Sequence, residues 1–406
     1  MPRRAPLGSG FRALFLGSVV SNTGDGIRLA ALPLLAAALT SSPLLISAVT
    51  AAQYLPWVTF APIGGALVDR RDRRRTILIT QAWRAVVLGV LALLVATSTA
   101  EVWHICVVAF LVTVGEILVD PATVAVLPTI VDDDDLDRAN ARISSGEIVT
   151  NDFAGGPVGA ALFAFAPWLP FLVDAVTYVG STLPFRRLPP GPPSDDAIAV
   201  RRSLRADAAE GFRFVRRHPV VGPLTAAIVV SFFGVAASLS LLVVLVTDEL
   251  GGGAAAFGLV LAIGAVGAFV GTLVGAPLSA RFGPRATLSI AVAFQAVTLA
   301  AAAFASSVWL LAVAWFANGV PAGVSRPVSR SLQQRLTPNH LLGRVNVTSR
   351  IFTRGVIVVG ALVAGGVASV GTVRDALVLA AVVQAVAAVM IWLALRNVAE
   401  HLATTQ

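Results

Sequence analysis

Long apolar runs, each about the length of a membrane-spanning helix, follow one another along most of this chain. A helix needs about 20 such residues to cross the hydrocarbon core of a bilayer, and Pro, Gly or charged residues mark the end of each run. The pattern predicts an all-α membrane protein with twelve transmembrane helices, at 11–39, 44–68, 76–97, 103–122, 144–165, 168–184, 220–246, 255–280, 287–305, 308–325, 351–369 and 374–395.

The composition agrees with this pattern and excludes several functions. Of the 406 residues, 56% are hydrophobic and 13% are charged, whereas a soluble domain has about 25% charged residues. All 30 basic residues are arginine, and the absence of lysine excludes a Walker A phosphate loop and a lysine Schiff base. The single cysteine and the four scattered histidines lack metal-ligand spacing. We therefore expect no metal, no cofactor and no enzymatic activity.

The arginines are distributed unevenly between the two ends of the predicted spans. With the N-terminus in the cytoplasm, 27 of the 30 lie in cytoplasmic segments, and only Arg374 lies in an external loop. Basic residues near span ends stay on the cytoplasmic side. We therefore expect a multi-pass protein of the cell membrane with both termini in the cytoplasm. This asymmetry also accounts for the net charge of +8, so no nucleic-acid partner is expected.

A proline-rich and arginine-rich segment follows the sixth predicted span. We expect an N-terminal six-helix half at 1–184, a cytoplasmic linker at 185–219 and a C-terminal six-helix half at 220–406. Apolar residues recur at helical spacing in the linker, with arginines on the other face, at Leu204, Ala208, Phe212 and Val215. This spacing predicts an amphipathic helix on the inner leaflet.

Two short sequences recur in both halves of the chain. Residues 64–76 align without a gap with 275–287, and residues 136–140 align with 342–346. These repeated segments predict two six-helix repeats. Parallel repeats that are related by an axis along the membrane normal place a substrate site near the midplane, between the halves.

The loop after the second predicted span resembles the signature loop of the major facilitator superfamily. The matching positions are Gly65, Asp69, Arg70, Arg73 and Arg74. Aspartate stands at position 72, where the family usually has glycine, and aspartate tolerates a tight turn. The resemblance implies the major facilitator fold, with this loop as a conformational switch. Asp120, near the end of the fourth span, is expected to join the switch by pairing with one of its arginines.

Further motifs resemble the twelve-span exporter branch of this superfamily, which includes macrolide efflux proteins and the enterobactin exporter. These motifs are Ser21–Asp25, Leu127-Pro128, Ala139-Asn140, Gly156-Pro157, Glu210–Phe214 and Leu342–Val345. The resemblance covers nearly the whole chain. It implies a transporter that works by alternating access and moves its substrate outward.

Charged residues inside the predicted spans are candidates for proton coupling, because an ionised side chain at the bilayer centre costs at least about 2.5 kcal/mol. In the first span, Asn22, Asp25 and Arg28 share one helix face. We expect this stripe to line the cavity, with Asp25 carrying a proton. The alternative is a local Asp25–Arg28 ion pair that only holds helices together.

Other spans contain further candidates. Glu116 is expected either to pair with Arg84 or to carry a proton, and Asp152 in the fifth span is a candidate functional acid. Four more residues are candidates for lining an amphipathic substrate cavity, namely Tyr54, Trp57, Trp315 and Asn318.

The sequence favours a secondary transporter that exports an amphipathic small molecule in exchange for protons. Its expected partners are the small-molecule substrate, protons and the lipid bilayer, and it is expected to act as a monomer. Two alternatives stay open at this point. One is uptake or facilitated diffusion of a metabolite by the same fold, and the other is a non-transporting membrane scaffold or receptor.

Overall fold

The computed structural model describes every residue except 1–6, 61–71, 191–209, 339–340 and 397–406. The described residues form helices joined by short turns, and no strand occurs among them. They group into two compact units, and each of these units is a bundle of helices.

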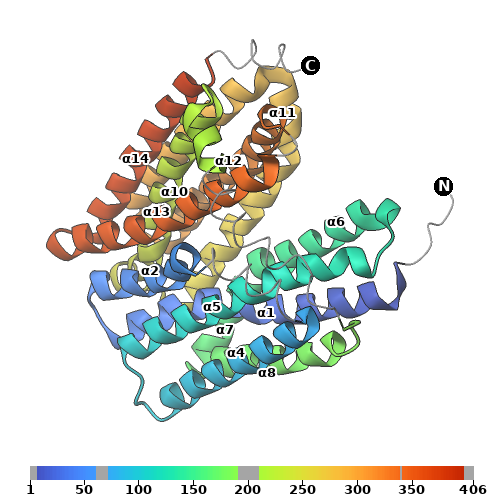
Figure 1. Ribbon diagram of the computed structural model, residues 1–406. Helices are drawn as coiled ribbons and strands as arrows, with labels where there is room; N and C mark the ends of the chain where they lie inside the picture. Colours follow the sequence, from blue (N-terminus) through green and yellow to red (C-terminus); the bar gives the residue numbers. More distant parts are fainter. Residues whose placement is uncertain (1–6, 61–71, 191–209, 339–340, 397–406) are drawn as a thin grey trace. The chain divides into compact units, whose positions relative to one another are not determined.

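The first unit contains α1 (Gly8–Leu39), α4 (Arg73–Ala96), α5 (Val102–Val126), α6 (Leu136–Glu147), α7 (Gly156–Phe165) and α8 (Leu169–Phe185). A π-helical segment, Ile148–Gly155, joins α6 to α7. Within this unit, α8 packs against both α1 and α4, and α5 packs against α4 (Figure 1). As a result, α1, α4 and α8 share an interior that can hold side chains from all three helices.

The second unit contains α2 (Pro43–Thr59), α10 (Val221–Val244), α11 (Gly253–Ala303), α12 (Val308–Leu336), α13 (Leu342–Val370) and α14 (Val373–Ala394). A π-helical segment, Leu245–Glu249, follows α10. Within this unit α14 packs against α10 and α11, while α13 packs against α10. Helix α2 groups with this unit, although the sequence prediction counts it in the N-terminal half.

Helices α11 and α12 make the most extensive contact of the second unit. Glycines allow this closeness, because a Cβ atom added at Gly267 or Gly271 would meet backbone carbonyls of α12, and one added at Gly319 or Gly323 would meet those of α11. Small residues at a helix interface let two backbones approach closely, and such contacts are favoured in membranes.

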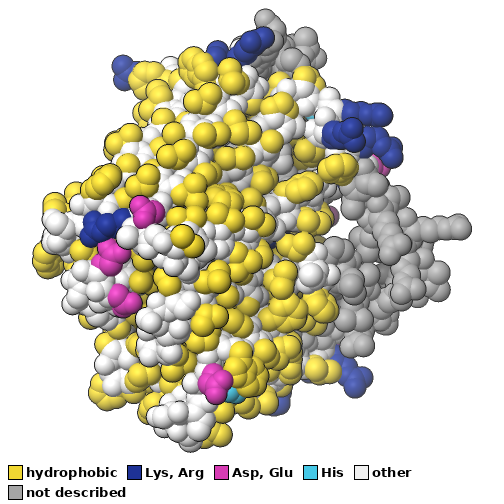
Figure 2. Space-filling view, turned by 90° about the vertical axis from the view of Figure 1, so that its left-hand side faces the viewer, with side chains coloured by type: hydrophobic (Ala, Val, Ile, Leu, Met, Phe, Trp, Pro, Cys, Tyr) yellow, Lys and Arg dark blue, Asp and Glu magenta, His cyan; other side chains and the backbone are white. Residues whose placement is uncertain are grey.

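Eight helices in the described ranges are long and apolar enough to cross a membrane. Each of the twelve predicted spans is helical over most of its described length, although a residue or two at some span ends, such as Trp168, Val220 and Leu395, lies in a turn. Residues 61–68, at the end of the second span, lie outside the described residues. Hydrophobic side chains predominate on the face shown in Figure 2, where charged side chains are few. The fold is therefore that of a helical membrane protein.

The two aligned loops of the sequence repeat differ in backbone conformation at one described pair of positions, 72 and 283. Asp72 has a φ of −56°, and its side-chain Oδ1 accepts a hydrogen bond of 2.7 Å from the amide of Arg75, which caps the start of α4. Gly283 aligns with Asp72, but it has a φ of 77° and a ψ of 158° and kinks α11. At this pair of positions, a glycine is therefore needed only in the second loop. In the first loop, aspartate serves as a helix cap.

The described end of the predicted linker helix, residues 210–217, packs against α13. Glu210 forms an ion pair with Arg344, and the ring centroids of Phe212 and Phe352 are 6.0 Å apart. Val215 is buried in the core of the second unit. The predicted positions 204 and 208 of this helix lie outside the described residues.

Candidate functional site

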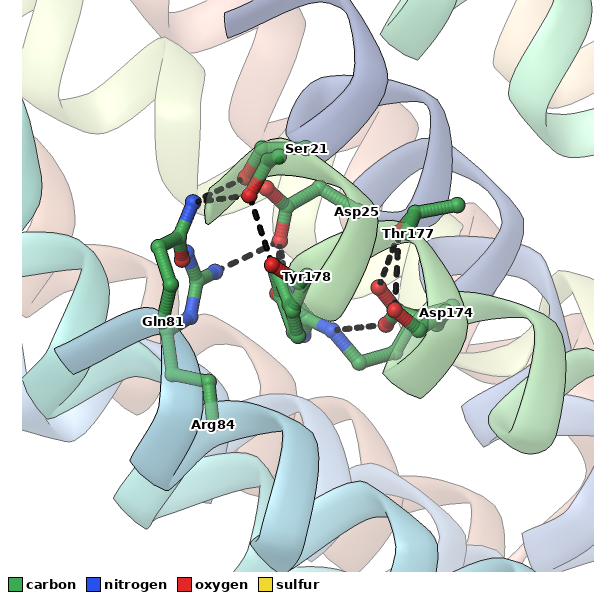
Figure 3. A network of polar contacts seen from close by, with 9 residues as sticks. Ser21, Asp25, Gln81, Arg84, Asp174, Thr177 and Tyr178 are labelled. Atoms are coloured by element: carbon green, nitrogen blue, oxygen red, sulfur yellow. Dashed lines mark hydrogen bonds and ion pairs between the residues drawn. The ribbon is translucent and has the colours of Figure 1, made fainter. Parts of the chain in front are cut away.

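A buried network of polar side chains connects α1, α4 and α8 in the first unit (Figure 3). The spacing along each helix brings these residues to one face, because positions three and four apart are neighbours on a helix. The network consists of Ser21, Asp25 and Arg28 on α1, Gln81 and Arg84 on α4, and Asp174, Thr177, Tyr178 and Ser181 on α8. We call the four charged residues, Asp25, Arg28, Arg84 and Asp174, the charge cluster.

Asp25 is the centre of this network. Its Oδ1 atom accepts hydrogen bonds from Nη2 of Arg28 at 2.7 Å, from Nη2 of Arg84 at 2.7 Å and from the hydroxyl of Tyr178 at 2.6 Å. The guanidinium of Arg84 also lies over the ring of Tyr178, 4.1 Å from its centroid. One carboxylate oxygen therefore ties together three helices.

Asp174 is the second acid of the charge cluster. Its Oδ2 lies 3.3 Å from Nε of Arg28, and its side chain is fully buried. A Cβ atom added at Gly24 would collide with the carboxylate of Asp174 and with the hydroxyl of Thr177. The absence of a side chain at position 24 therefore makes room for Asp174 against α1.

Gln81 extends the network toward one side. Its Nε2 donates to the hydroxyls of Ser21 at 2.9 Å and Ser181 at 3.2 Å, while its Oε1 accepts from Nη1 of Arg84 at 3.3 Å. These bonds orient the guanidinium of Arg84 toward Asp25. Gln81 thus positions the arginine that links α4 to α1.

The charges of the cluster balance, with two guanidinium groups facing two carboxylates. Removing one partner from a buried ion pair costs about 3–5 kcal/mol, because the other charge is left uncompensated. Asp25 has a side-chain exposure of 12%, whereas the other three charged side chains are 2% exposed or less. Asp25 therefore has the most exposed side chain of the four charged residues. Nη1 of Arg28 and Nε of Arg84 are buried without a hydrogen-bond partner among the described residues.

The structure brings together some of the residues predicted for proton coupling and separates others. Asp25, Arg28 and Arg84 meet in the charge cluster. Asn22 is half-buried and makes no hydrogen bond in this network. Glu116 is half-buried on α5. Arg84 bonds Asp25, so an Arg84–Asp25 pair takes the place of the expected Arg84–Glu116 ion pair.

The side chain of Asp152 lies outside the described residues, as do Gly65, Asp69 and Arg70 of the signature loop. In the described end of this loop, Nη1 of Arg73 donates to the carbonyl of Ala125 at 2.9 Å, which fastens the start of α4 to the end of α5. Arg74 is half-buried and Asp120 is exposed.

The four residues predicted to line a substrate cavity occupy separate places in the second unit. Tyr54 and Trp57 of α2 lie under the guanidinium groups of Arg350 and Arg354 of α13. Trp315 packs against α11, where a Cβ atom at Gly264 would collide with its ring. Asn318 donates a hydrogen bond of 3.0 Å to the hydroxyl of Thr298 and is part of the same helix contact.

Sequence reasoning missed Asp174, Tyr178 and Gln81 as members of the site. The signal was present for two of them, because Asp174 and Tyr178 are four residues apart on one face of a predicted span. An acid and a phenol at this spacing inside a span are costly unless they have partners. Gln81 precedes Arg84 by three residues and provides the same kind of signal.

Comparison with known proteins agrees with this fold. The family model described as "Transmembrane secretion effector", a family of the major facilitator superfamily, matches residues 3–405. The chain belongs to this family. The family and its relatives are transporters and not enzymes.

Several curated relatives of this transporter-family chain are efflux proteins. The multidrug efflux pump Tap of Mycolicibacterium fortuitum is 27% identical, over 82% of each chain. The enterobactin exporter EntS of Shigella boydii is 28% identical, over 83% of this chain and 80% of that protein. Macrolide efflux protein A of Streptococcus pyogenes is 25% identical over 43% of this chain. The chain spans 42% of the length of this last relative, and 53% of another relative that it matches, the uncharacterized MFS-type transporter YvqJ of Bacillus subtilis.

The fold of this chain is similar to that of solved transporter structures. A bacterial homologue of the human lysosomal transporter Spinster, in an inward-facing and occupied conformation, superposes with a TM-score of 0.75. The match covers 96% of this chain and 97% of that chain at 14% identity. At this identity the similarity concerns the fold.

Proposed function

We propose that this protein is a secondary exporter that moves an amphipathic small molecule out of the cell in exchange for protons. The observation that carries the proposal is the balanced charge cluster, in which Asp25 bonds residues of α1, α4 and α8 through one oxygen atom. The alternative of a local Asp25–Arg28 pair does not describe this arrangement, because Asp25 also bonds Arg84 and Tyr178. The efflux relatives support the outward direction and an amphipathic substrate.

The charge cluster suggests how protons would drive the cycle. Protonation of Asp25 removes one of two negative charges, so the pairs with Arg28 and Arg84 weaken together. Helix α1 is then held less firmly to α4 and α8. If α1 has two packing arrangements, losing this contact shifts the equilibrium between them. The partial exposure of Asp25 supports it as the acid that exchanges the proton.

The proposed architecture has twelve spans in two six-helix halves, 1–184 and 220–406, joined by the linker 185–219. Both termini are in the cytoplasm and the protein acts as a monomer. The signature loop serves as the conformational switch, and the bond from Arg73 to the end of α5 supports its role in holding two helix ends together.

Expression in an efflux-deficient bacterial host tests this function directly. Growth is measured against a panel of toxic compounds that includes a macrolide such as erythromycin, because a macrolide exporter is among the relatives. We expect increased resistance to at least one amphipathic compound. Uptake of that compound into everted membrane vesicles should require an acidic interior and should stop when a protonophore is added.

Two variants make the experiment specific. Asp25→Asn should abolish uptake driven by the pH gradient, and Asp134→Asn, which neutralises an exposed acid outside the spans, should leave it intact. Vesicle uptake that is insensitive to the protonophore would favour facilitated diffusion. Unchanged resistance across the whole panel, with the protein present in the membrane, would favour the scaffold or receptor.

A further inference from the structure

Two arginines of α13 lie over two aromatic rings of α2 in the second unit. Arg350 and Arg354 are four residues apart, so they project from one face of α13, and Tyr54 and Trp57 are three apart on one face of α2. The guanidinium carbon of Arg354 is 5.1 Å from the ring centroid of Tyr54 and 5.2 Å from that of Trp57. The corresponding distance from Arg350 to Trp57 is 5.5 Å. All three distances lie within the cation–π range of about 6 Å.

These two guanidinium groups have no carboxylate within ion-pair distance in the described part of the chain. Other arginines in the same helices or inside the bundles do have one. Arg344 of α13 pairs with Glu210, and Arg28 and Arg84 share Asp25. The α13 arginines are therefore a local excess of positive charge with free N–H donors.

The position of Arg354 adds to this excess. It is the fourth residue of the predicted span 351–369, so it lies about 5 Å past the predicted start of that span. Its side chain is half-buried. An unpaired charge inside a span marks a functional site by default.

We propose that Arg350, Arg354, Tyr54 and Trp57 form a binding site, the α2–α13 anion site, for an amphipathic organic anion. A guanidinium that lies over a ring keeps its planar N–H edge free, and this edge matches the two oxygens of a carboxylate or phosphate. Trp57 is buried beneath the two guanidinium groups, and the half-buried ring of Tyr54 supplies a flat apolar surface for the rest of the ligand. The site therefore selects a carboxylate or phosphate that is attached to an aromatic or flat apolar group.

This inference rests on the proposed function, because it makes such an anion the substrate of the exporter. The phosphate of an anionic phospholipid headgroup shares the same chemistry. We assign the site to the free anion, because the half-buried ring of Tyr54 offers a surface that a headgroup, whose acyl chains stay in the bilayer, would leave uncovered.

An equilibrium binding experiment tests the site without requiring transport. The purified full chain is placed in phosphatidylcholine nanodiscs and titrated with naphthalene-2-carboxylate or with naphthalene-2-carboxamide, which has nearly the same shape but no charge. Binding is measured from the shift of the thermal transition. The carboxylate should bind at least about tenfold more tightly than the carboxamide, which is the factor that one charge-assisted hydrogen bond provides.

The variants locate the effect. Arg350→Gln combined with Arg354→Gln should weaken carboxylate binding at least about tenfold and leave the carboxamide unchanged. Arg335→Gln is the matched control, since it removes the charge of an exposed arginine near the end of α12. Its carboxylate affinity should stay the same. Arg354→Lys keeps the charge but not the planar fork and should give an intermediate affinity.

Three results would overturn the assignment. The first is equal binding of the carboxylate and the carboxamide, and the second is equal loss in the α13 double variant and in Arg335→Gln. The third is loss of carboxylate binding by the unchanged chain when phosphatidylglycerol is added to the nanodiscs, which would identify a lipid headgroup as the occupant. Because none of these measurements uses a proton gradient, their outcome is independent of whether export is proton-coupled.

Discussion

Asp25 is shared by two buried arginines, and this sharing decides what its substitution does. Asparagine keeps the volume and an accepting oxygen, but it cannot neutralise Arg28 and Arg84. Asp174 would remain as the single negative charge against two positive charges. The cluster would then contain an uncompensated buried cation.

Asp25→Asn should therefore lower the stability of the folded protein by about 3–5 kcal/mol. The measurement is the thermal unfolding transition of the purified protein in detergent. Tyr178→Phe is the comparison, because it removes one hydrogen bond and no charge, and it should cost only about 1 kcal/mol.

The double variant Asp25→Asn with Arg84→Gln restores the charge balance, with Arg28 facing Asp174. It should recover part of the lost stability without recovering gradient-driven transport. Equal stability of the single and double variants would contradict the electrostatic explanation. Recovery of gradient-driven transport in the double variant would show that Asp25 does not carry the proton.

Asp72 and Gly283 occupy aligned positions but respond differently to substitution. Gly283→Ala places a Cβ atom on a backbone that only glycine adopts readily, so it should cost about 1–3 kcal/mol. Asp72→Gly removes a cap but leaves an allowed backbone, so it should cost only a few tenths of a kcal/mol. Thermal unfolding of both variants checks this, and the reverse order would contradict it.

At the scale of elements, the contact between α1 and α8 depends on the missing side chain of Gly24. A methyl group there would displace the carboxylate of Asp174 and the hydroxyl of Thr177. Gly24→Ala should therefore destabilise the protein by about 1–3 kcal/mol through overpacking. Gly89 of α4 has open space around it, so Gly89→Ala should stabilise the protein by about 0.5–1 kcal/mol. Thermal unfolding distinguishes the two, and equal effects would argue against this close contact.

The helices could be predicted from the sequence because a span needs only a long apolar run. Their partners could not, as Arg84 illustrates. The depth of Arg84 in its span made Glu116 a plausible partner, but in the structure Arg84 bonds Asp25. Depth follows from counting residues, whereas the neighbour that a helix face meets depends on how the whole bundle packs. For the same reason Asp174 could be recognised as a costly acid but not assigned to Arg28.

At the scale of the whole molecule, some contacts join segments that are predicted to lie on the same side of the membrane. Arg374, in a predicted external loop, donates a hydrogen bond of 2.8 Å to Glu249, and another of 2.8 Å to the carbonyl of Ala303. Glu249 and Ala303 also end helices on the predicted external side. Glu210 and Arg344, which form an ion pair, both lie in segments that are predicted to be cytoplasmic.

Cysteine labelling tests the topology. In a Cys106→Ala background, a cysteine at position 252 should react with an impermeant maleimide added to intact cells. A cysteine at position 194 should react only after the membrane is opened. External labelling at position 194 would overturn the arrangement with both termini in the cytoplasm.

The glycine contacts between α11 and α12 also predict a distance that stays fixed during the transport cycle. Because the two backbones touch directly, neither can slide without separating from the other, so α12 and the part of α11 before its kink at Gly283 should move as one rigid body. Spin labels at the exposed positions Leu259 of α11 and Val313 of α12 should keep one sharp distance in inward-open and outward-open conditions. That fixed distance would serve as the reference against which every moving helix of the protein is measured.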